Sequence, residues 1–142
     1  MKKGSLLKNK TLIIGCGRLG ASIASKDSAS GKNVIVVDRD PLSFEMLSDR
    51  FSGLKYVGDV TDLSLLEEAF ITSTKDIIIV TGDDNVNVFL ATVAREIYNV
   101  PNIYVRLDDP TLEILVRGLD VHAIFPYKLS FDKFLLTRGG KL

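Results

Sequence analysis

Three glycines with a fixed spacing, Gly15, Gly17 and Gly20, follow a short apolar run that ends at Ile14. When this pattern lies between a strand and a helix, the first glycine permits a tight turn. The second lets a phosphate approach the backbone, and the third lets the helix pack closely on the sheet. The first N–H groups of such a helix lack intrahelical partners and carry partial positive charge. The spacing therefore predicts a phosphate-binding turn over residues 15–20.

A second apolar run, residues 34–37, ends in Asp38, at the distance expected for an acid that binds the ribose hydroxyls of an adenosine. The carboxylate repels a 2′-phosphate and so favours NAD over NADP, although the neighbouring Arg39 weakens this preference. ATP and ADP use the same half of such a site, and the sequence does not separate them from NAD or NADH. A glycine-rich turn in some other α/β protein is the alternative, and the complete series of strand, turn, helix, strand and acid argues against it.

Small and polar residues also follow the later apolar runs. Ligands of doubly wound sheets bind beyond the carboxyl ends of the strands, so we expect these residues to lie along one edge. Asp59 is then placed to face the adenine, Gly82 to allow close approach of the ligand, and Arg18 and Arg106 to meet phosphate charge. The candidate ligand-binding residues are Gly15, Gly17, Arg18, Leu19, Gly20, Asp38, Arg39, Gly58, Asp59, Val60, Thr81, Gly82, Asp83 and Arg106. For Asp84 and Asn85 we favour helix capping.

The residues needed for catalysis are hard to find in this chain. No tyrosine is followed four residues later by lysine, the pair that short-chain reductases use. The single histidine, His122, lies inside a predicted strand, and the single cysteine, Cys16, fits a small buried position better than a reactive one. One histidine and one cysteine do not make a typical structural zinc site. We therefore expect a site that holds a nucleotide without transforming it, with no catalytic residues and no metal.

The elements that must position these residues alternate between strand and helix. The expected strands are 11–14, 34–38, 54–57, 76–80, 103–106 and 121–125. The expected helices are 18–30, 41–51, 63–70, a long helix to residue 98, 110–117 and 127–136. This alternation predicts an α/β fold, a Rossmann-like, doubly wound, mostly parallel six-stranded sheet with helices on both faces. The apolar run 77–80 is typical of a strand that is buried on both faces.

The composition is that of a single globular domain. The chain has 142 residues and a formal net charge of zero, which argues against a surface built for nucleic acid. One cysteine excludes an intrachain disulfide and favours a reducing compartment. The first seven residues faintly resemble the start of a signal peptide, but their apolar part is too short, and no stretch approaches the length of a membrane span. We expect an N-terminal segment over 1–9, a nucleotide-binding domain over 10–126, and a C-terminal helix and tail over 127–142.

Four segments together resemble the TrkA-N domain, the N-terminal domain of regulators of potassium conductance, also called RCK or KTN. They are the glycine turn 15–20, the segment 37–41, Gly-Asp-Val-Thr-Asp over 58–62 and Thr-Gly-Asp-Asp-Asn-Val-Asn over 81–87. The resemblance implies a cytoplasmic regulator on the inner face of the membrane that senses NAD, NADH, ATP or ADP for a Trk- or Ktr-type potassium transporter or channel. It also implies ligand contacts at Gly15, Gly17, Arg18, Gly20, Asp38, Asp59, Thr81 and Arg106.

The resemblance further implies a homo-oligomer, either a dimer or a larger gating ring, and a membrane-embedded transporter subunit as partner. Tyr127, Phe131, Phe134 and Leu135 have helical spacing along one face, and related domains pack a corresponding helix across the subunit interface. Two other functions stay open. The coenzyme-binding domain of an NAD-dependent oxidoreductase needs a substrate pocket and a proton donor, and a redox-sensing DNA regulator needs a basic recognition helix. The sequence shows none of these features.

Overall fold

The computed structural model describes residues 7–140. The first six residues of the expected N-terminal segment and the last two of the expected C-terminal tail lie outside the described residues. Six strands form one sheet: β1 (Lys10–Ile14), β2 (Asn33–Asp38), β3 (Leu54–Val57), β4 (Thr74–Ile79), β5 (Asn102–Arg106) and β6 (His122–Ile124). Their order is β3-β2-β1-β4-β5-β6, and every neighbouring pair is parallel. The predicted Rossmann-like sheet is therefore confirmed, and all of its strands run in one direction.

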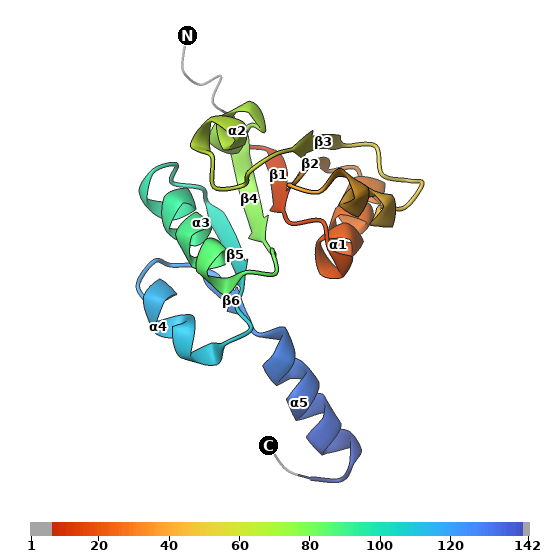
Figure 1. The fold of residues 1–142 in the computed structure, drawn as a ribbon, viewed down its shortest axis with the longest axis vertical. Helices are drawn as coiled ribbons and strands as arrows, with labels where there is room; N and C mark the ends of the chain where they lie inside the picture. Colours follow the sequence, from red (N-terminus) through yellow and green to blue (C-terminus); the bar gives the residue numbers. More distant parts are fainter. Residues whose placement is uncertain (1–6, 141–142) are drawn as a thin grey trace.

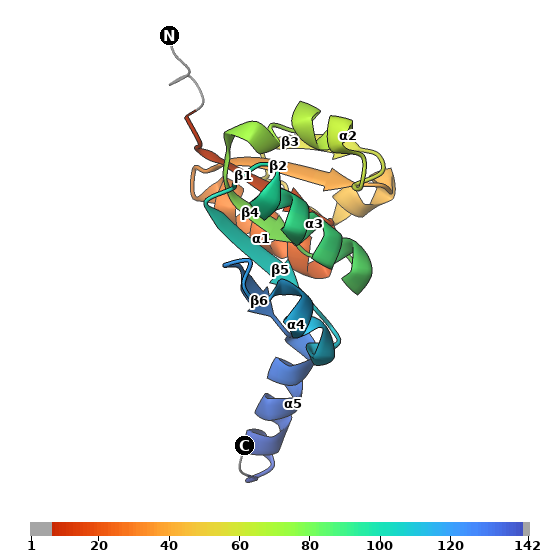
Figure 2. The same cartoon turned by 90° about the vertical axis from the view of Figure 1, so that its left-hand side faces the viewer.

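Helices cover both faces of this sheet (Figures 1 and 2). The α-helices are α1 (Arg18–Ala29), α2 (Leu63–Glu68), α3 (Asp84–Glu96), α4 (Glu113–Val116) and α5 (Pro126–Thr137). Short 3-10 helices are η2 (Pro41–Met46), η3 (Ile71–Ser73) and η4 (Pro110–Leu112). The crossover between β3 and β4 carries the chain back past β1, which places the switch in strand order between β1 and β4.

Alternate residues of the central strands feed two separate cores. Leu12 and Ile14 of β1 point to the core under α2, α3 and α4, whereas Ile13 points to the smaller core under α1. All three side chains are completely buried. Because β1 lies in the middle of the sheet and is buried on both faces, packing on both sides anchors the turn that follows it.

The second core reaches the edge of β4 but does not extend over β5 and β6. Ile77 and Ile79 are buried as expected, but Ile78, on the other face, is only half-buried. It lines an open groove of about 350 Å³ together with Tyr104 and Ile124. The expectation that the run 77–80 is buried on both faces is therefore met except at Ile78, which is only partly covered because no described helix of the chain covers the same face of β5 and β6.

Two expected helices are shorter than the sequence pattern indicates. The segment after Pro41 forms the 3-10 helix η2 and stops at Met46, and no residue of it is buried, so packing does little to extend it. The expected helix 110–117 begins as η4 and becomes α-helical only from Glu113 to Val116. The last helix, α5, forms as expected, opened by Pro126, and both views show it projecting away from the sheet (Figures 1 and 2).

Candidate functional site

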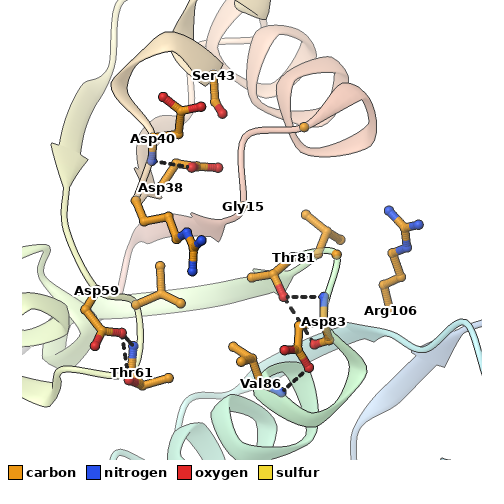
Figure 3. Close-up of a pocket in the computed structure, with 15 residues that line it drawn as sticks. Gly15, Asp38, Asp40, Ser43, Asp59, Thr61, Thr81, Asp83, Val86 and Arg106 are labelled. Atoms are coloured by element: carbon orange, nitrogen blue, oxygen red, sulfur yellow. Dashed lines mark hydrogen bonds between the residues drawn. The ribbon is translucent and has the colours of Figure 1, made fainter.

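A cavity of about 570 Å³ opens at the carboxyl-terminal edge of the sheet (Figure 3). Gly15 lies on one side of it, Thr81 and Asp83 lie on the other, and Asp59 and Arg106 lie at opposite ends. Most of the residues expected to bind a ligand line this one cavity: Gly15, Gly17, Asp38, Arg39, Asp59, Val60, Thr81, Gly82, Asp83 and Arg106. The fold thus brings together residues from five strand ends, as a doubly wound sheet requires at its switch point.

The glycines of the turn are required for different reasons. Gly15 has a φ of +106°, and a Cβ there would meet Thr81 N at 2.9 Å. At Gly20 a Cβ would lie 1.9 Å from the carbonyl oxygen of Gly15, which is incompatible with the observed packing. Gly17, in contrast, has open space where its Cβ would be, and so does Gly82 on the opposite wall. The packing of the protein itself therefore gives no reason for glycine at these two cavity-lining positions.

The two helices that begin at the cavity differ in how they are capped. The N-cap of α1 is Gly17, no side chain caps this helix, and its first turn contains no acid. The N-cap of α3 is Asp83, whose Oδ1 accepts hydrogen bonds from Asn85 N at 2.9 Å and from Val86 N at 3.2 Å. Capping by Asp84 or Asn85 was therefore a wrong expectation. The amino terminus of α1 keeps its free N–H groups for an anion, whereas that of α3 is already satisfied.

Asp38 holds the turn together. Its Oδ2 accepts a hydrogen bond from Cys16 N at 2.7 Å, and its Oδ1 accepts one from Asp40 N at 2.8 Å. The carboxylate therefore fixes the glycine turn against the loop after β2. Each carboxylate oxygen retains a second lone pair, so the side chain can still accept a hydrogen bond from a hydroxyl in the cavity.

Asp59 is a preorganised acceptor at the other end of the cavity. Its Oδ1 accepts hydrogen bonds from the Thr61 hydroxyl at 2.7 Å and from Thr61 N at 2.9 Å. The hydroxyl hydrogen bond, the backbone hydrogen bond and, more weakly, the charge of Arg39 hold the pKa of the Asp59 carboxyl below its ordinary value. This side chain is consequently an ionised acceptor at neutral pH and a poor candidate for a general acid.

A buried asparagine that the sequence analysis did not select connects two walls of the cavity. Asn87 in α3 is completely buried, and its Nδ2 donates hydrogen bonds to Thr81 O at 3.0 Å and to Arg106 O at 2.9 Å. Its Oδ1 accepts a hydrogen bond from the Thr81 hydroxyl. The signal in the sequence is its place one helical turn after the N-cap Asp83, which points the side chain back toward the strand ends.

Some expected residues lie outside the cavity lining. Leu19 lines the open groove over β4–β6 instead, Gly20 and Gly58 serve close packing, and the Arg18 side chain is exposed at the start of α1. A Cβ on Gly58 would come within 2.8 Å of Leu65 Cδ2, the end of a flexible side chain, so packing requires glycine less strictly here than at Gly20. The structure also adds lining residues that the strand-end rule did not select: Asp40, Ser43, Thr61, Val80 and Val86.

The groups with catalytic potential lie apart from one another. His122 in β6 is exposed and stacks on Tyr104, with ring centroids 5.0 Å apart, and it does not line the cavity. Burial and, to a smaller extent, the nearby Asp38 carboxylate together raise the pKa of the Cys16 thiol to about 11. Among residues 7–140 no group of three or more His, Cys, Asp or Glu side chains is placed to hold a metal ion.

Comparison with known proteins identifies the family. The model of the TrkA-N domain matches residues 11–126. The chain belongs to the TrkA-N family. A relative from Streptomyces coelicolor, named Trk system potassium uptake protein TrkA, is 34% identical over 124 residues, which is 87% of this chain and 56% of that protein. The chain thus spans about half the length of the curated relatives it matches.

Solved structures share the fold of this TrkA-N domain. The TrkA-N domain of the inner membrane protein ybaL from Escherichia coli superposes with a TM-score of 0.76 at 20% identity, covering 92% of this chain and 97% of that one. GsuK bound to ADP gives a TM-score of 0.76, and the GsuK channel bound to NAD gives 0.74, both at 23% identity. They cover 93% and 92% of this chain, and 35% and 24% of the GsuK chains. Within the described residues, no helix of the TrkA-N domain is long and apolar enough to cross a membrane.

Proposed function

We propose that this TrkA-N domain is the nucleotide-sensing part of a regulatory subunit that gates a potassium uptake transporter or channel of the Trk or Ktr type. The observation that carries the proposal is the cavity beside the uncapped amino terminus of α1, with unhindered glycines at positions 17 and 82. The names of the relatives, which are Trk system potassium uptake proteins, support the link to potassium.

The ligand we propose is an adenine nucleotide, either NAD or NADH, or ATP or ADP. Its phosphates would lie over Gly17, where the first N–H groups of α1, from Arg18 to Gly20, offer hydrogen bonds. Its ribose would lie at Asp38 and its adenine beside Asp59 and Val60. Arg39, Thr81, Gly82, Asp83 and Arg106 would complete the site. The GsuK structures bound to NAD and to ADP support both ligand classes on this fold.

We infer that the domain is not an enzyme. The buried Cys16, with its raised pKa, is a poor nucleophile, and the ionised Asp59 is a poor proton donor. His122, the only histidine of the chain, lies outside the cavity lining. An oxidoreductase would need a proton donor beside the nicotinamide, and the titratable side chains among the described lining residues are carboxylates and arginines.

The partners we propose are a membrane-embedded potassium transporter subunit and further copies of this chain, on the cytoplasmic face of the membrane. α5 supports the second partner, because none of its residues is buried within the chain and Tyr127, Phe131 and Phe134 are more than half exposed. Two nucleotides that contact the cavity differently would favour different arrangements of the oligomer, and the transporter would respond to that arrangement. A ligand that bound both arrangements equally would shift nothing.

Calorimetric titration of the purified protein with NADH, NAD, ADP, ATP and NADPH tests this proposal. We compare the wild type with Gly17→Ala, which adds a methyl group in the space proposed for the phosphates, and with Ser22→Ala one turn further along α1. We expect Gly17→Ala to weaken nucleotide binding, Ser22→Ala to leave it unchanged, and chromatography to recover the bound nucleotide unaltered. Conversion of NADH during the titration, or equal binding by all three proteins, would contradict the proposal.

A further inference from the structure

Arg106, at the end of β5, lines the open groove over β4–β6 and also borders two further hollows. It lines the nucleotide cavity, and it lines a second, open hollow of about 450 Å³ at the base of α5. The other residues of the second hollow are Asp108, Pro126, Tyr127 and Ser130. The guanidinium group of Arg106 is therefore within reach of the candidate phosphate site and of the first turn of the exposed helix.

Asp108 holds this guanidinium in the second hollow. Arg106 Nε donates a hydrogen bond to Asp108 Oδ1 at 3.0 Å, and Nη2 donates one to Asp108 Oδ2 at 3.3 Å. The Arg106 side chain is 28% exposed and that of Asp108 is 47% exposed, so the pair is open to solvent and to competition. An exposed ion pair of this kind is weak enough for a ligand anion to replace one partner.

The backbone on both sides of the pair is fixed. Asn87 Nδ2 holds the carbonyl oxygen of Arg106, and the Asp84 carboxylate accepts hydrogen bonds from Asp108 N at 2.8 Å and Asp109 N at 2.9 Å. An exchange of partners is consequently confined to the two side chains. The loop between β5 and η4 keeps its path.

The first turn of α5 lacks a side-chain acceptor for its free N–H groups, and the Asp108 carboxylate can supply one. Its N-cap is Phe125, no side chain caps the helix, and its first turn contains no acid. Pro126 has no N–H, so the free donors of this turn are the amides of Tyr127 and Lys128. A carboxylate in the same hollow is suited to accept from them and to interact favourably with the amino-terminal end of the helix.

The nucleotide cavity carries an excess of negative charge, so a bound phosphate depends on the positive charge of Arg106. The charged side chains that line it are Asp38, Asp40, Asp59, Asp83, Arg39 and Arg106, so carboxylates outnumber guanidinium groups. A phosphate entering this cavity needs the guanidinium of Arg106, and Asp108 offsets that positive charge.

We propose that Arg106 exchanges Asp108 for a phosphate of the bound nucleotide, and that the released Asp108 carboxylate then caps α5. This inference rests on the proposed nucleotide site and adds to it a route from the ligand to the helix that is proposed to join subunits. Asp108 thereby sets two quantities at once. It lowers the affinity for phosphate in the empty state and fixes the first turn of α5 in the bound state.

Three variants separate these two effects. Asp108→Asn removes the charge but keeps an oxygen that can cap a helix, and Asp108→Ala removes both. Glu113→Gln is the control, because it disrupts the exposed Glu113–Arg117 pair and its residues line neither hollow. By calorimetry we expect both Asp108 variants to bind ADP roughly two- to fivefold more tightly than the wild type. Adenosine, which has no phosphate, should bind all four proteins equally.

Hydrogen exchange of the Tyr127 and Lys128 amides tests the second effect. We expect ADP to slow this exchange in the wild type by at least about threefold, the size expected of a helix cap. In Asp108→Asn, where the ion pair with Arg106 is lost, the exchange should already be slow without ADP. In Asp108→Ala, ADP should leave it unchanged. Adenosine should leave it unchanged in every protein.

The outcomes distinguish this inference from the proposed function. If the wild type binds neither ADP nor adenosine, the proposed nucleotide site is wrong, and the change of partner by Arg106 that rests on it is wrong as well. If ADP binds the wild type but the Asp108 variants bind it no more tightly than Glu113→Gln does, the nucleotide site is supported and the proposed change of partner by Arg106 is overturned. The proposed change of partner is equally overturned if ADP binds the wild type without slowing hydrogen exchange of the Tyr127 and Lys128 amides.

Discussion

The glycines of the binding turn have separate physical roles, which substitution by alanine should separate. At Gly20 an added Cβ meets the Gly15 carbonyl at 1.9 Å, so Gly20→Ala must displace α1 from the sheet. We expect it to lower the free energy of unfolding by more than about 2 kcal/mol. At Gly17 nothing lies within 4 Å, so Gly17→Ala should change stability by less than about 1 kcal/mol. Denaturant unfolding of the two variants measures the difference, and equal destabilisation would contradict these roles.

Cys16 makes the stability of the fold depend on pH in the alkaline range. Burial, together with the Asp38 carboxylate, raises the pKa of its thiol from 9.0 to about 11. The unfolded chain therefore ionises this thiol at a lower pH than the folded protein does. The contribution to stability is fully present below pH 9 and is lost as the pH rises from 9 toward 11.

We expect the wild type to lose unfolding free energy relative to Cys16→Ala over that interval, by up to roughly 2–3 kcal/mol. Other groups that titrate in this range are common to both proteins, so the comparison isolates the thiol. Denaturant unfolding at pH 8 and pH 10.5 measures it. Parallel pH profiles for the two proteins would show that the thiol keeps its ordinary pKa in the fold.

At the scale of elements, Asn87 fastens α3 to the ends of β4 and β5. Its three hydrogen bonds are buried, and Asn87→Ala leaves two backbone carbonyls and the Thr81 hydroxyl without their partner. We expect a loss of about 2–3 kcal/mol in unfolding free energy, together with weaker nucleotide binding because Thr81 and Arg106 both line the cavity. Asn85→Ala is the matched control, since Asn85 lies on the same helix and is exposed. Similar losses in both variants would contradict the role of Asn87.

Periodicity and turn chemistry were sufficient to predict the order of the elements, because each strand here is an apolar run that ends in a small or polar residue. They were not sufficient to predict which acid caps α3. Asp83, Asp84 and Asn85 are all good capping residues, and only the path of the loop selects Asp83. Asp84 instead reaches the backbone of the next loop, a contact made across 24 residues of sequence. The cavity-lining residues Asp40 and Ser43 were missed for the same reason, since η2 folds them back over the site.

For the molecule as a whole, two apolar surfaces are left uncovered by the rest of residues 7–140. One is the sheet face over β4–β6, where Ile78, Tyr104 and Ile124 line an open groove. The other is α5, which exposes aromatic side chains along one face and also Leu129 and Leu136, which are 62% and 53% exposed. Both sides of α5 are therefore apolar, whereas a helix in contact with water on one side carries polar residues there. The homo-oligomer proposed above would cover both features, because each copy carries the same two faces.

The prediction that follows concerns the state of association. Phe131→Asp places a charge in the middle of the aromatic face of α5, where its residue is 51% exposed in the single chain. If α5 is buried between copies, this change must desolvate a carboxylate, so we expect it to convert a dimer or larger assembly into monomers. Lys133→Asp introduces the same residue at an exposed position on another side of the helix and should leave more of the assembly intact. Sedimentation velocity of the wild type and both variants, with and without ADP, measures this. A wild type that sediments as a monomer at high micromolar concentration in both conditions would show that the apolar surfaces of α5 bind a different partner, and the potassium transporter subunit would then be the first to test.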